Sequence, residues 1–412
     1  MDDFVPGIGC KFKREPMGIL PTVVLELDEL RNDYKAKRKE ALEKHGKESA
    51  EYRKWNTAQL TVKRMRASIY GATGNPNFGW YDRSIAENIT GAGREALMLI
   101  VEKAEEWGYQ VIYGDTDSIF VKVGDDLSPE EAGKASAELG NRLTEYMRTR
   151  TDIYARTDAI DVEAEAVMDK IMISAKKRYG GRIVWLPDTG TDIMDLPIEA
   201  RLKITGLKMK GSKTAPVGKE IEKNSLVELF DGKHVDDIVT TVKNYIDRIK
   251  SDFSNGIISV EEICGRARLR KSIPPSHLLQ QIAPKIAKKN SHYSEGSSTV
   301  NVPNPEYLTQ LSNYHKAAAW HNIVLVNDDY APIEQGDSYY TTFVCDGPTW
   351  IPNGGMVGFH DIEQISEYTI DIDKVIEKNI IDSMDSIMSA MGGNKELLSP
   401  KEILFMVADY IE

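Results

Sequence analysis

The segment 110–123 constrains the fold most, because it has the pattern of two short strands joined by an acidic turn. Its two arms are built from β-branched and aromatic residues, and the stretch 114–117 between them is Gly-Asp-Thr-Asp. This pattern predicts a β-hairpin. Because side chains alternate along a strand, Asp115 and Asp117 are expected on the same side of the sheet.

The acidic turn also indicates a chemistry. Two like charges held together at the tip of a rigid element are costly unless a cation lies between them. Phosphoryl transfer uses such carboxylates to hold Mg²⁺ at a triphosphate. The alternative is an ordinary turn in which Asp115 and Asp117 bind nearby backbone groups, and the four turn residues alone do not decide between the two.

Composition excludes several classes of protein. A chain of 412 residues is long enough for two or three domains, and 28% charged residues is ordinary for a globular protein. No run of apolar residues is long enough to span a membrane, so we expect no membrane partner. The three cysteines, Cys10, Cys264 and Cys345, are far apart and fit neither a disulfide framework nor a zinc site. We therefore expect a cytoplasmic location, in a prokaryotic cell or a virus-infected host.

The net charge of −12 at first disfavours a nucleic-acid partner. Its distribution weakens that objection, because basic side chains outnumber acidic ones in residues 1–70, whereas acidic ones dominate residues 350–412. A protein can hold DNA on one locally basic face.

Periodicity predicts mainly helical structure around the hairpin. Residues 23–45 and 49–69 form two basic helices, with a loop at 71–79 and a further helix at 83–106. Strands are expected within 160–186. Beyond about residue 187 helical patterns dominate, ending in a helix at 373–391.

With its apolar flanks, the sequence Tyr-Gly-Asp-Thr-Asp-Ser at 113–118 resembles motif C of the family B DNA polymerases. The resemblance implies a right-hand fold of palm, fingers and thumb. It also implies that Asp117 is the main ligand of a catalytic Mg²⁺, with Asp115 supporting it.

The second helix resembles motif B of the same family, in which a lysine precedes Asn-Ser and then Tyr-Gly. Lys63, Ser68, Tyr70 and Gly71 match this pattern, but Ala67 stands where the family carries asparagine. The resemblance implies that Lys63 contacts the triphosphate of an incoming dNTP and that Tyr70 packs beside the new base pair. The departure at Ala67 puts normal nucleotide selection or closure of the fingers in doubt.

The run into the first helix is also similar to the family. By that match Arg31 and Lys35, one helical turn apart, face the phosphates together with Lys63. Without the family match, all three residues would be ordinary surface cations.

Lys176, Lys177, Arg178 and Tyr179 resemble the family's KKRY element, which implies contacts with primer–template DNA. Basic side chains on phosphates hold DNA without reading its sequence. The stretch 205–214 falls where the family begins its thumb, and its Ser-x-Thr-x-Pro ending is most similar to tailed-phage members.

The expected fold class is therefore α+β: a partial palm with an antiparallel sheet, fingers formed by a helical hairpin, and a mostly helical thumb. Residues 1–22 lead into the palm, 23–70 form the fingers, 71–182 the palm with motif C, and 183–412 the thumb.

The family's motif A, Asp-x-x-Ser-Leu-Tyr-Pro-Ser, does not occur in this sequence. We therefore expect the C-terminal part of a split DNA polymerase, inactive until a separate N-terminal chain supplies motif A. The same N-terminal chain could also carry the exonuclease. A non-catalytic DNA-binding remnant and a different palm enzyme, such as a reverse transcriptase, are the alternatives.

Two further motifs are weaker. His360-Asp361-Ile362-Glu363 only superficially resembles an exonuclease motif. Ile403, Leu404 and Phe405 could bind a sliding clamp, although a final helix is the simpler interpretation.

Overall fold

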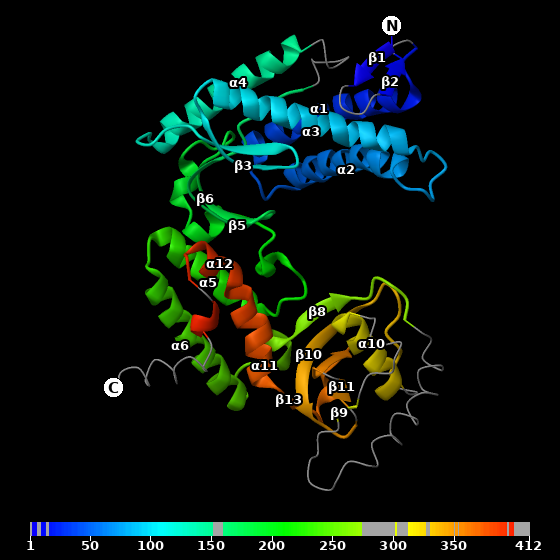
Figure 1. The fold of residues 1–412 in the computed structure, drawn as a ribbon, viewed down its shortest axis with the longest axis vertical. Coiled ribbons are helices and arrows are strands. Elements are labelled where there is room, and N and C mark those ends of the chain that lie inside the picture. The colour runs from blue at the N-terminus through cyan, green and yellow to red at the C-terminus, as the bar shows by residue number, and fades with distance from the viewer. Residues whose placement is uncertain are drawn as a thin grey trace. The chain divides into compact units, whose positions relative to one another are not determined.

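The computed structural model describes residues 2–5, 10–13, 16–150, 160–273, 301–302, 312–326, 330–349, 351–352, 354–393 and 395–398. The chain divides into two compact units. The first unit comprises Met1–Val167 with Leu186–Gly190, and the second comprises Met168–Trp185 with Thr191–Glu412. Helices and mainly antiparallel sheets occupy separate stretches of the chain (Figure 1), which confirms the expected α+β class. None of the helices in these ranges is long and apolar enough to cross a membrane.

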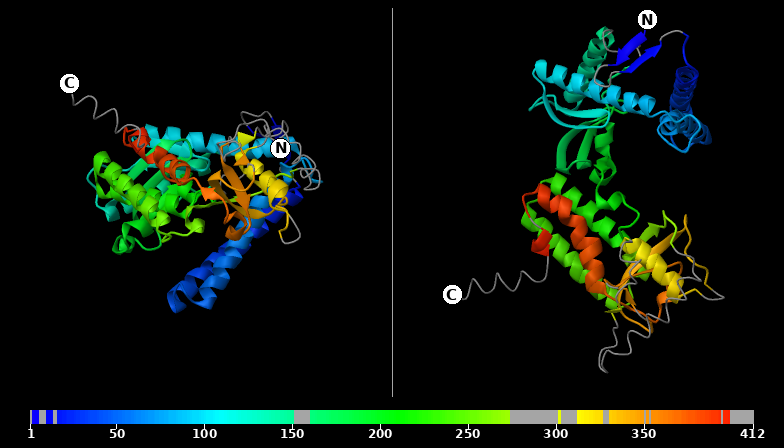
Figure 2. Two further views of the ribbon diagram at one scale, coloured as in Figure 1. Left: turned by 90° about the horizontal axis from the view of Figure 1, so that it is seen from below. Right: turned by 45° about the vertical axis from the view of Figure 1, so that its right-hand side comes forward.

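Four long helices form most of the first unit: α1 (Ile19–His45), α2 (Ala50–Thr73), α3 (Arg83–Glu106) and α4 (Pro129–Thr149). The first two confirm the predicted basic helices, and they pack side by side as a helical hairpin that projects from the rest of its unit (Figure 2). Ahead of them, β1 (Asp2–Val5) and β2 (Cys10–Lys13) pair antiparallel.

The connection between α2 and α3 is shorter than the sequence indicates. The prediction that residues 71–79 all lie in a loop is wrong for 71–73, because α2 continues through Thr73. A glycine inside a helix costs only about 1 kcal/mol, so Gly71 does not stop it. The Thr73 hydroxyl donates to the Tyr70 carbonyl at 3.0 Å within this last turn. Helix α3 then begins where Asp82 accepts hydrogen bonds from two backbone N–H groups.

The predicted hairpin is present as β3 (Gln110–Asp115) and β4 (Ser118–Lys122), paired antiparallel. Ile119 and Val121 of β4 pack against a core that α3 and α4 supply. The buried members of that core are Ile100, Leu139, Leu143 and Met147. The acidic turn is thus carried by a hairpin with a packed base.

The second unit begins with a three-stranded sheet, which confirms the strands expected within 160–186. Its order is β5 (Val167–Ala175), β6 (Arg178–Trp185) and β7 (Leu202–Thr205). Two helices, α5 (Pro216–Asp231) and α6 (Val235–Ser254), follow and share one apolar core with the C-terminal helical segment.

That C-terminal segment confirms the helix predicted for 373–391. It runs through α11 (Ile372–Ile376), a π-helical turn η6 (Glu377–Ile381) and α12 (Asp382–Ala390). An apolar stripe of this segment is buried in that core: Val375, Ile376, Ile380, Met384, Ile387 and Met388.

A second sheet in this unit was not anticipated from the sequence. Strand β10 (Ser338–Asp346) pairs with β8 (Gly265–Arg268), β12 (Met356–Phe359) and β13 (Thr369–Ile370). Helix α10 (Asn313–Val324) packs against β10 and β12, with Trp320 fully buried. Strands β9 (Asn301–Val302) and β11 (Ile351–Pro352) form a short parallel pair.

Candidate functional site

The acidic turn is a two-residue loop. Asp115 is the last residue of β3 and pairs with Ser118, the first residue of β4, so Thr116 and Asp117 alone form the loop. Thr116 has a φ of 58°, a left-handed conformation that few residues other than glycine adopt. The Asp117 N–H donates to the Asp115 carbonyl at 2.7 Å, which closes the turn. Because Asp117 lies outside the strands, alternation along a strand does not fix its direction.

The two carboxylates lie in different surroundings. Asp115 is half-buried, and its Oδ1 accepts a hydrogen bond from the Thr116 hydroxyl at 3.0 Å. Asp117 is exposed. The strand before the turn is irregular, since the pairing shifts between Val111 and Tyr113 and leaves Ile112 as an extra residue. Such bulges often occur beside functional sites, where they redirect neighbouring side chains.

The donors of this turn are those that Mg²⁺ prefers. Mg²⁺ is commonly held by one or two carboxylates, with waters and substrate phosphates completing its shell. In the part of the chain that the structure describes, no three His, Cys, Asp or Glu side chains gather as a metal site. A magnesium ion held by Asp115 and Asp117 would take its remaining ligands from outside the hairpin.

Helices α1 and α2 place the predicted nucleotide-binding cations along one hairpin. An ion pair joins Asp28 to Arg66, and further along the rings of Tyr34 and Trp55 lie 5.6 Å apart. Because the helices are antiparallel, Arg31 lies opposite the stretch of α2 between those two contacts, and that stretch contains Lys63.

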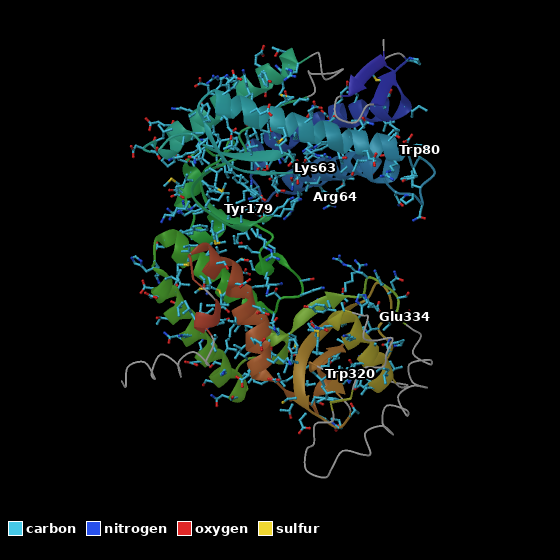
Figure 3. The ribbon with its side chains drawn as sticks, in the orientation of Figure 1. Lys63, Arg64, Trp80, Tyr179, Trp320 and Glu334 are labelled. Atoms are coloured by element: carbon cyan, nitrogen blue, oxygen red, sulfur yellow. The ribbon has the colours of Figure 1, made fainter. Side chains whose placement is uncertain are left out.

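The individual cations differ in exposure. Arg31 and Lys35 are half-buried, whereas Lys63 is exposed on α2 (Figure 3). The Nε atom of Arg31 is buried and has no hydrogen-bond partner within the described ranges. Buried guanidinium N–H groups are costly when unpaired.

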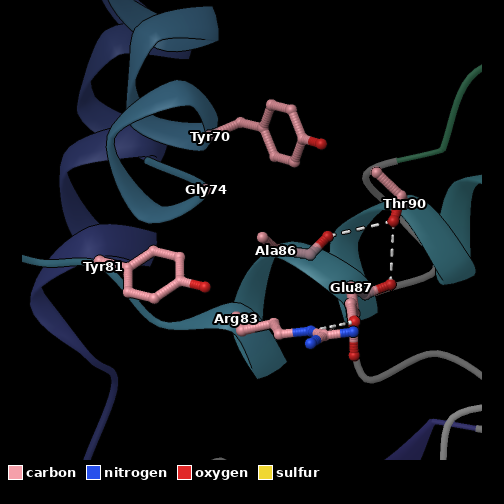
Figure 4. A pocket seen from close by; sticks show the side chains of 7 residues that line it. All are labelled: Tyr70, Gly74, Tyr81, Arg83, Ala86, Glu87 and Thr90. Carbon is pink, nitrogen blue, oxygen red and sulfur yellow. Dashed lines mark hydrogen bonds and ion pairs between the residues drawn. The ribbon is translucent and has the colours of Figure 1, made fainter. Parts of the chain in front are cut away.

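Tyr70 lines an open pocket of about 340 Å³ where α2 meets α3 (Figure 4). The same pocket is lined by Gly74, Tyr81, Arg83, Ala86, Glu87 and Thr90. Arg83 Nε donates to Glu87 Oε1 at 2.6 Å, and the Thr90 hydroxyl contacts the Ala86 and Glu87 carbonyls. Sequence reasoning identified Tyr70 but missed the other side chains. The only signal for them was the helix predicted at 83–106, which contains Arg83, Ala86, Glu87 and Thr90.

The basic element at 176–179 lies in the second unit, at the turn between β5 and β6. Lys176, Lys177 and Arg178 are exposed, and Lys177 has a φ of 61°. Tyr179 is only 5% exposed, so its ring lies in the interior of the unit (Figure 3). The three cations are thus on the surface, while the aromatic residue helps to anchor the strand that carries them.

The structure therefore brings some predicted residues into one unit and separates others. Asp115, Asp117, the three cations of α1 and α2, and Tyr70 all belong to the first unit, where α3 contacts α2, β3 and β4. The 176–179 element belongs to the second unit. Asp361, part of the exonuclease-like sequence, instead caps a short 3-10 helix, η5 (Ile362–Ile365). Ile403, Leu404 and Phe405 lie outside the described residues.

Comparison with known proteins finds several DNA polymerases that are similar in sequence to this chain. The DNA polymerase of Archaeoglobus fulgidus is 28% identical over 259 residues, covering 63% of this chain and 28% of that protein. DNA polymerase 2 of Aeropyrum pernix is 26% identical over 246 residues, covering 60% of this chain and 26% of that protein. The DNA polymerase alpha catalytic subunit of Oxytricha trifallax is 25% identical over 256 residues, covering 62% and 16%. The chain spans less than a third of the length of each of these relatives.

A solved structure is similar as well. The family B DNA polymerase from the hyperthermophilic archaeon Pyrobaculum calidifontis gives a TM-score of 0.49 at 23% identity, covering 94% of this chain and 40% of that one. A family model described as DNA polymerase family B matches residues 3–298. Because that match covers well over half of the sequence, this chain belongs to DNA polymerase family B.

Proposed function

We propose that this chain supplies part of the catalytic site of a template-directed DNA polymerase that adds dNTPs to a primer 3′ end. The observation that carries the proposal is the acidic turn of the β3–β4 hairpin, with Asp115 at the end of β3 and Asp117 in the two-residue loop, in a chain of this family. The relatives' own names, DNA polymerases, support the reaction class.

Asp117 is the main metal ligand in this proposal, and Asp115 supports it. When bound, Mg²⁺ would neutralise the triphosphate and favour ionisation of the primer hydroxyl. The exposed Asp117 is available to an ion and to a substrate, while Asp115 is fixed by the Thr116 hydroxyl and by its place at the strand end. The hairpin's packed base holds the two carboxylates without a cost of reorganisation during the reaction.

Arg31, Lys35 and Lys63 would bind the phosphates of the incoming dNTP. A guanidinium can bind phosphate oxygens with two parallel hydrogen bonds, and a lysine acts as a point charge. The bracketing contacts of α1 with α2, which place Arg31 opposite the stretch that contains Lys63, support this assignment. Tyr70, at the edge of the α2–α3 pocket, would pack against the new base pair.

Lys176, Lys177 and Arg178 would contact the phosphates of primer–template DNA, with Tyr179 supporting the strand from inside the second unit. In our proposal the motif A aspartate comes from a separate N-terminal chain, which could also carry the exonuclease. The proposal includes a sliding clamp as a partner, bound through Ile403, Leu404 and Phe405. It also includes a cytoplasmic location.

One observation favours a second candidate function, a non-catalytic DNA-binding remnant. Ala67 is exposed on α2 and stands where the family has asparagine, so a contact used in nucleotide selection is missing. The retained Asp115, Asp117, Arg31 and Lys63 favour catalysis, because DNA binding alone does not need them.

A reconstituted primer-extension assay distinguishes the two functions. The chain is mixed with a family B polypeptide that carries motif A, a primer–template and dNTPs, with and without Mg²⁺. We expect extension that requires both polypeptides and Mg²⁺, and that Asp117→Ala lowers by about 1000-fold or more, the effect of losing about 4 kcal/mol. Asp126→Ala, an exposed aspartate just beyond β4, is the matched control and should retain activity. Full activity of the Asp117 variant would refute the metal assignment, and absence of extension with every complementing polypeptide would favour the remnant.

A further inference from the structure

Glu222 of α5 is a charged residue in an unusual place. Its side chain is 0% exposed, and it lies in the apolar core region formed by α5 and its neighbours. Burying a carboxylate without compensation costs several kcal/mol, and an apolar side chain of similar volume would usually serve stability better. A buried carboxylate therefore calls for a specific partner.

Its partner is the backbone of a short turn that comes before α5. The Met209 N–H donates to Glu222 Oε2, and the Lys208 backbone N–H contacts the same carboxylate. Both residues belong to the 3-10 helix η4 (Lys208–Lys210), which begins just after β7. The other oxygen, Oε1, is buried without a hydrogen-bond partner in the described structure, so the carboxylate's contacts are directed at the turn.

The turn is held from two further sides. Lys208 Nζ donates to the Asp382 carbonyl at 2.6 Å, which ties it to the start of α12. Gly206, with a φ of 67°, precedes the turn, and a Cβ there would lie 1.8 Å from the Lys177 carbonyl oxygen. The backbone of residue 206 therefore packs directly against the basic turn between β5 and β6.

The same turn carries an exposed cation. Lys210 is exposed and forms no ion pair among the described residues. Tyr179 pairs with Thr205 at the end of β7, so η4 leaves the sheet at the end where Lys176, Lys177 and Arg178 lie. Cations gathered at one sheet end suit a polyanion such as the DNA backbone.

We propose that Glu222 is a positioning residue: by holding the backbone of Lys208 and Met209, it fixes the turn that presents Lys210 to a DNA phosphate beside the 176–178 cations. This inference rests on the proposed DNA polymerase function. It assigns Glu222 no contact with DNA. The acceptor oxygen is what matters, so glutamine should replace glutamate and an apolar residue should not.

Salt dependence of DNA binding tests the inference. The full chain is titrated with a fluorescent primer–template between about 50 and 200 mM salt, where each phosphate contact contributes about 0.9 to the slope of log affinity against log salt. We expect Lys210→Ala to weaken binding on the order of 5-fold and to lower the slope by about 0.9. Glu222→Met, which keeps the volume but removes the acceptor, should do the same. Glu222→Gln should bind like the unmodified chain.

The double variant Lys210→Ala with Glu222→Met decides whether the two residues act together. If Glu222 acts through Lys210, the double variant loses no more affinity or slope than Lys210→Ala alone. Additive losses, or a Glu222→Met variant with lower thermal stability but an unchanged slope, would overturn the inference. Should Glu222→Met fail to fold, Met209→Pro removes the donor from the turn's side and must show the same loss of slope.

Failure of the underlying function gives a different result. If this chain were not a DNA-binding polymerase part, the unmodified chain and Lys210→Ala would bind the duplex equally weakly. The inference about Glu222 fails, while the proposed function stands, if Lys210→Ala lowers the slope and neither Glu222→Met nor Met209→Pro changes it.

Discussion

The exposure of Lys63 does not by itself indicate whether the side chain binds a ligand; its position on the helix is also needed. It is an exposed lysine on α2, like its neighbour Arg64, and exposure alone does not distinguish them. Successive residues on a helix point about 100° apart, so only one of the two can face a ligand bound along a given stripe. The contacts that bracket α1 and α2 place Arg31 opposite the stretch that contains Lys63.

Replacing Lys63 should therefore affect nucleotide use. A hydrogen bond to a charged group contributes about 1.5–3 kcal/mol, so Lys63→Ala should raise the KM for dNTP by about 10- to 100-fold. Steady-state kinetics of the reconstituted polymerase measure this, with Arg64→Ala as the matched control. Equal KM values for the two variants would remove Lys63 from the nucleotide site.

Glu222 should make stability depend on pH. Burial raises the pKa of Glu222 to about 7 from 4.5, although the N–H groups of Met209 and Lys208 oppose the shift. Between these two values the folded chain binds more protons than the unfolded one, so stability falls as pH rises from about 4.5 to about 7. A shift of this size corresponds to about 3 kcal/mol.

Urea unfolding at about pH 5 and pH 8 checks this expectation. Glu222→Gln cannot titrate, so the unmodified chain should lose stability relative to this variant as pH rises. A stability difference between the two proteins that stays constant across this range would contradict the assigned burial of the carboxylate.

At the level of elements, α4 closely approaches the segment that follows it in the chain. Thr144 exchanges hydrogen bonds with the backbone of Val162, and a Cβ on Gly140 would lie 2.8 Å from the Val162 carbonyl oxygen. Helix and following segment therefore approach closely only because residue 140 has no side chain.

Gly140→Ala should lower the free energy of unfolding by about 2 kcal/mol, because backbone atoms must move to admit the methyl group. Gly93→Ala on α3 is the control in the same unit, since an added Cβ there meets nothing within 4 Å. The control should be stabilising by about 0.5–1 kcal/mol, since alanine favours helix. Chemical denaturation measures both, and a Gly140→Ala variant as stable as the Gly93→Ala variant would contradict this packing.

Elements set by local sequence could be predicted, and those set by distant partners could not. The helices α1 to α3 and the β3–β4 hairpin follow from local periodicity and turn residues, whereas α4 was not predicted. The sheet around β10 was missed because its strands pair across long stretches of chain, as where Ser338 meets Arg268. Burial of Tyr179 likewise depends on its tertiary surroundings. From the sequence alone, its side chain was therefore expected to contact DNA together with the neighbouring cations.

The candidate site divides in the same way. Asp115 and Asp117 could be located from the sequence, but the two-residue loop could not, because it depends on how β3 and β4 align past the extra residue at Ile112. The wall of the α2–α3 pocket, including Tyr81 and Arg83, arises only when the two helices meet. The assignment of these elements to fingers, palm and thumb stays a prediction.

Over the whole molecule, net charge and composition do not show where the charged side chains gather. A net charge of −12 coexists with exposed cations on α2 and at the β5–β6 turn. DNA binding depends on such local fields rather than on net charge. In the proposed function these local cations would contact DNA and nucleotide.

The most direct test is the position of the metal in that complex. The chain, a complementing polypeptide with motif A, a chain-terminated primer–template and the incoming dNTP are crystallised with Mn²⁺ in place of Mg²⁺, and the ion is located by its anomalous scattering. The account predicts an ion bonded to the Asp117 carboxylate at about 2.1 Å and lost in Asp117→Asn. An ion held at the dNTP by other carboxylates, with Asp115 and Asp117 both out of reach, would contradict it.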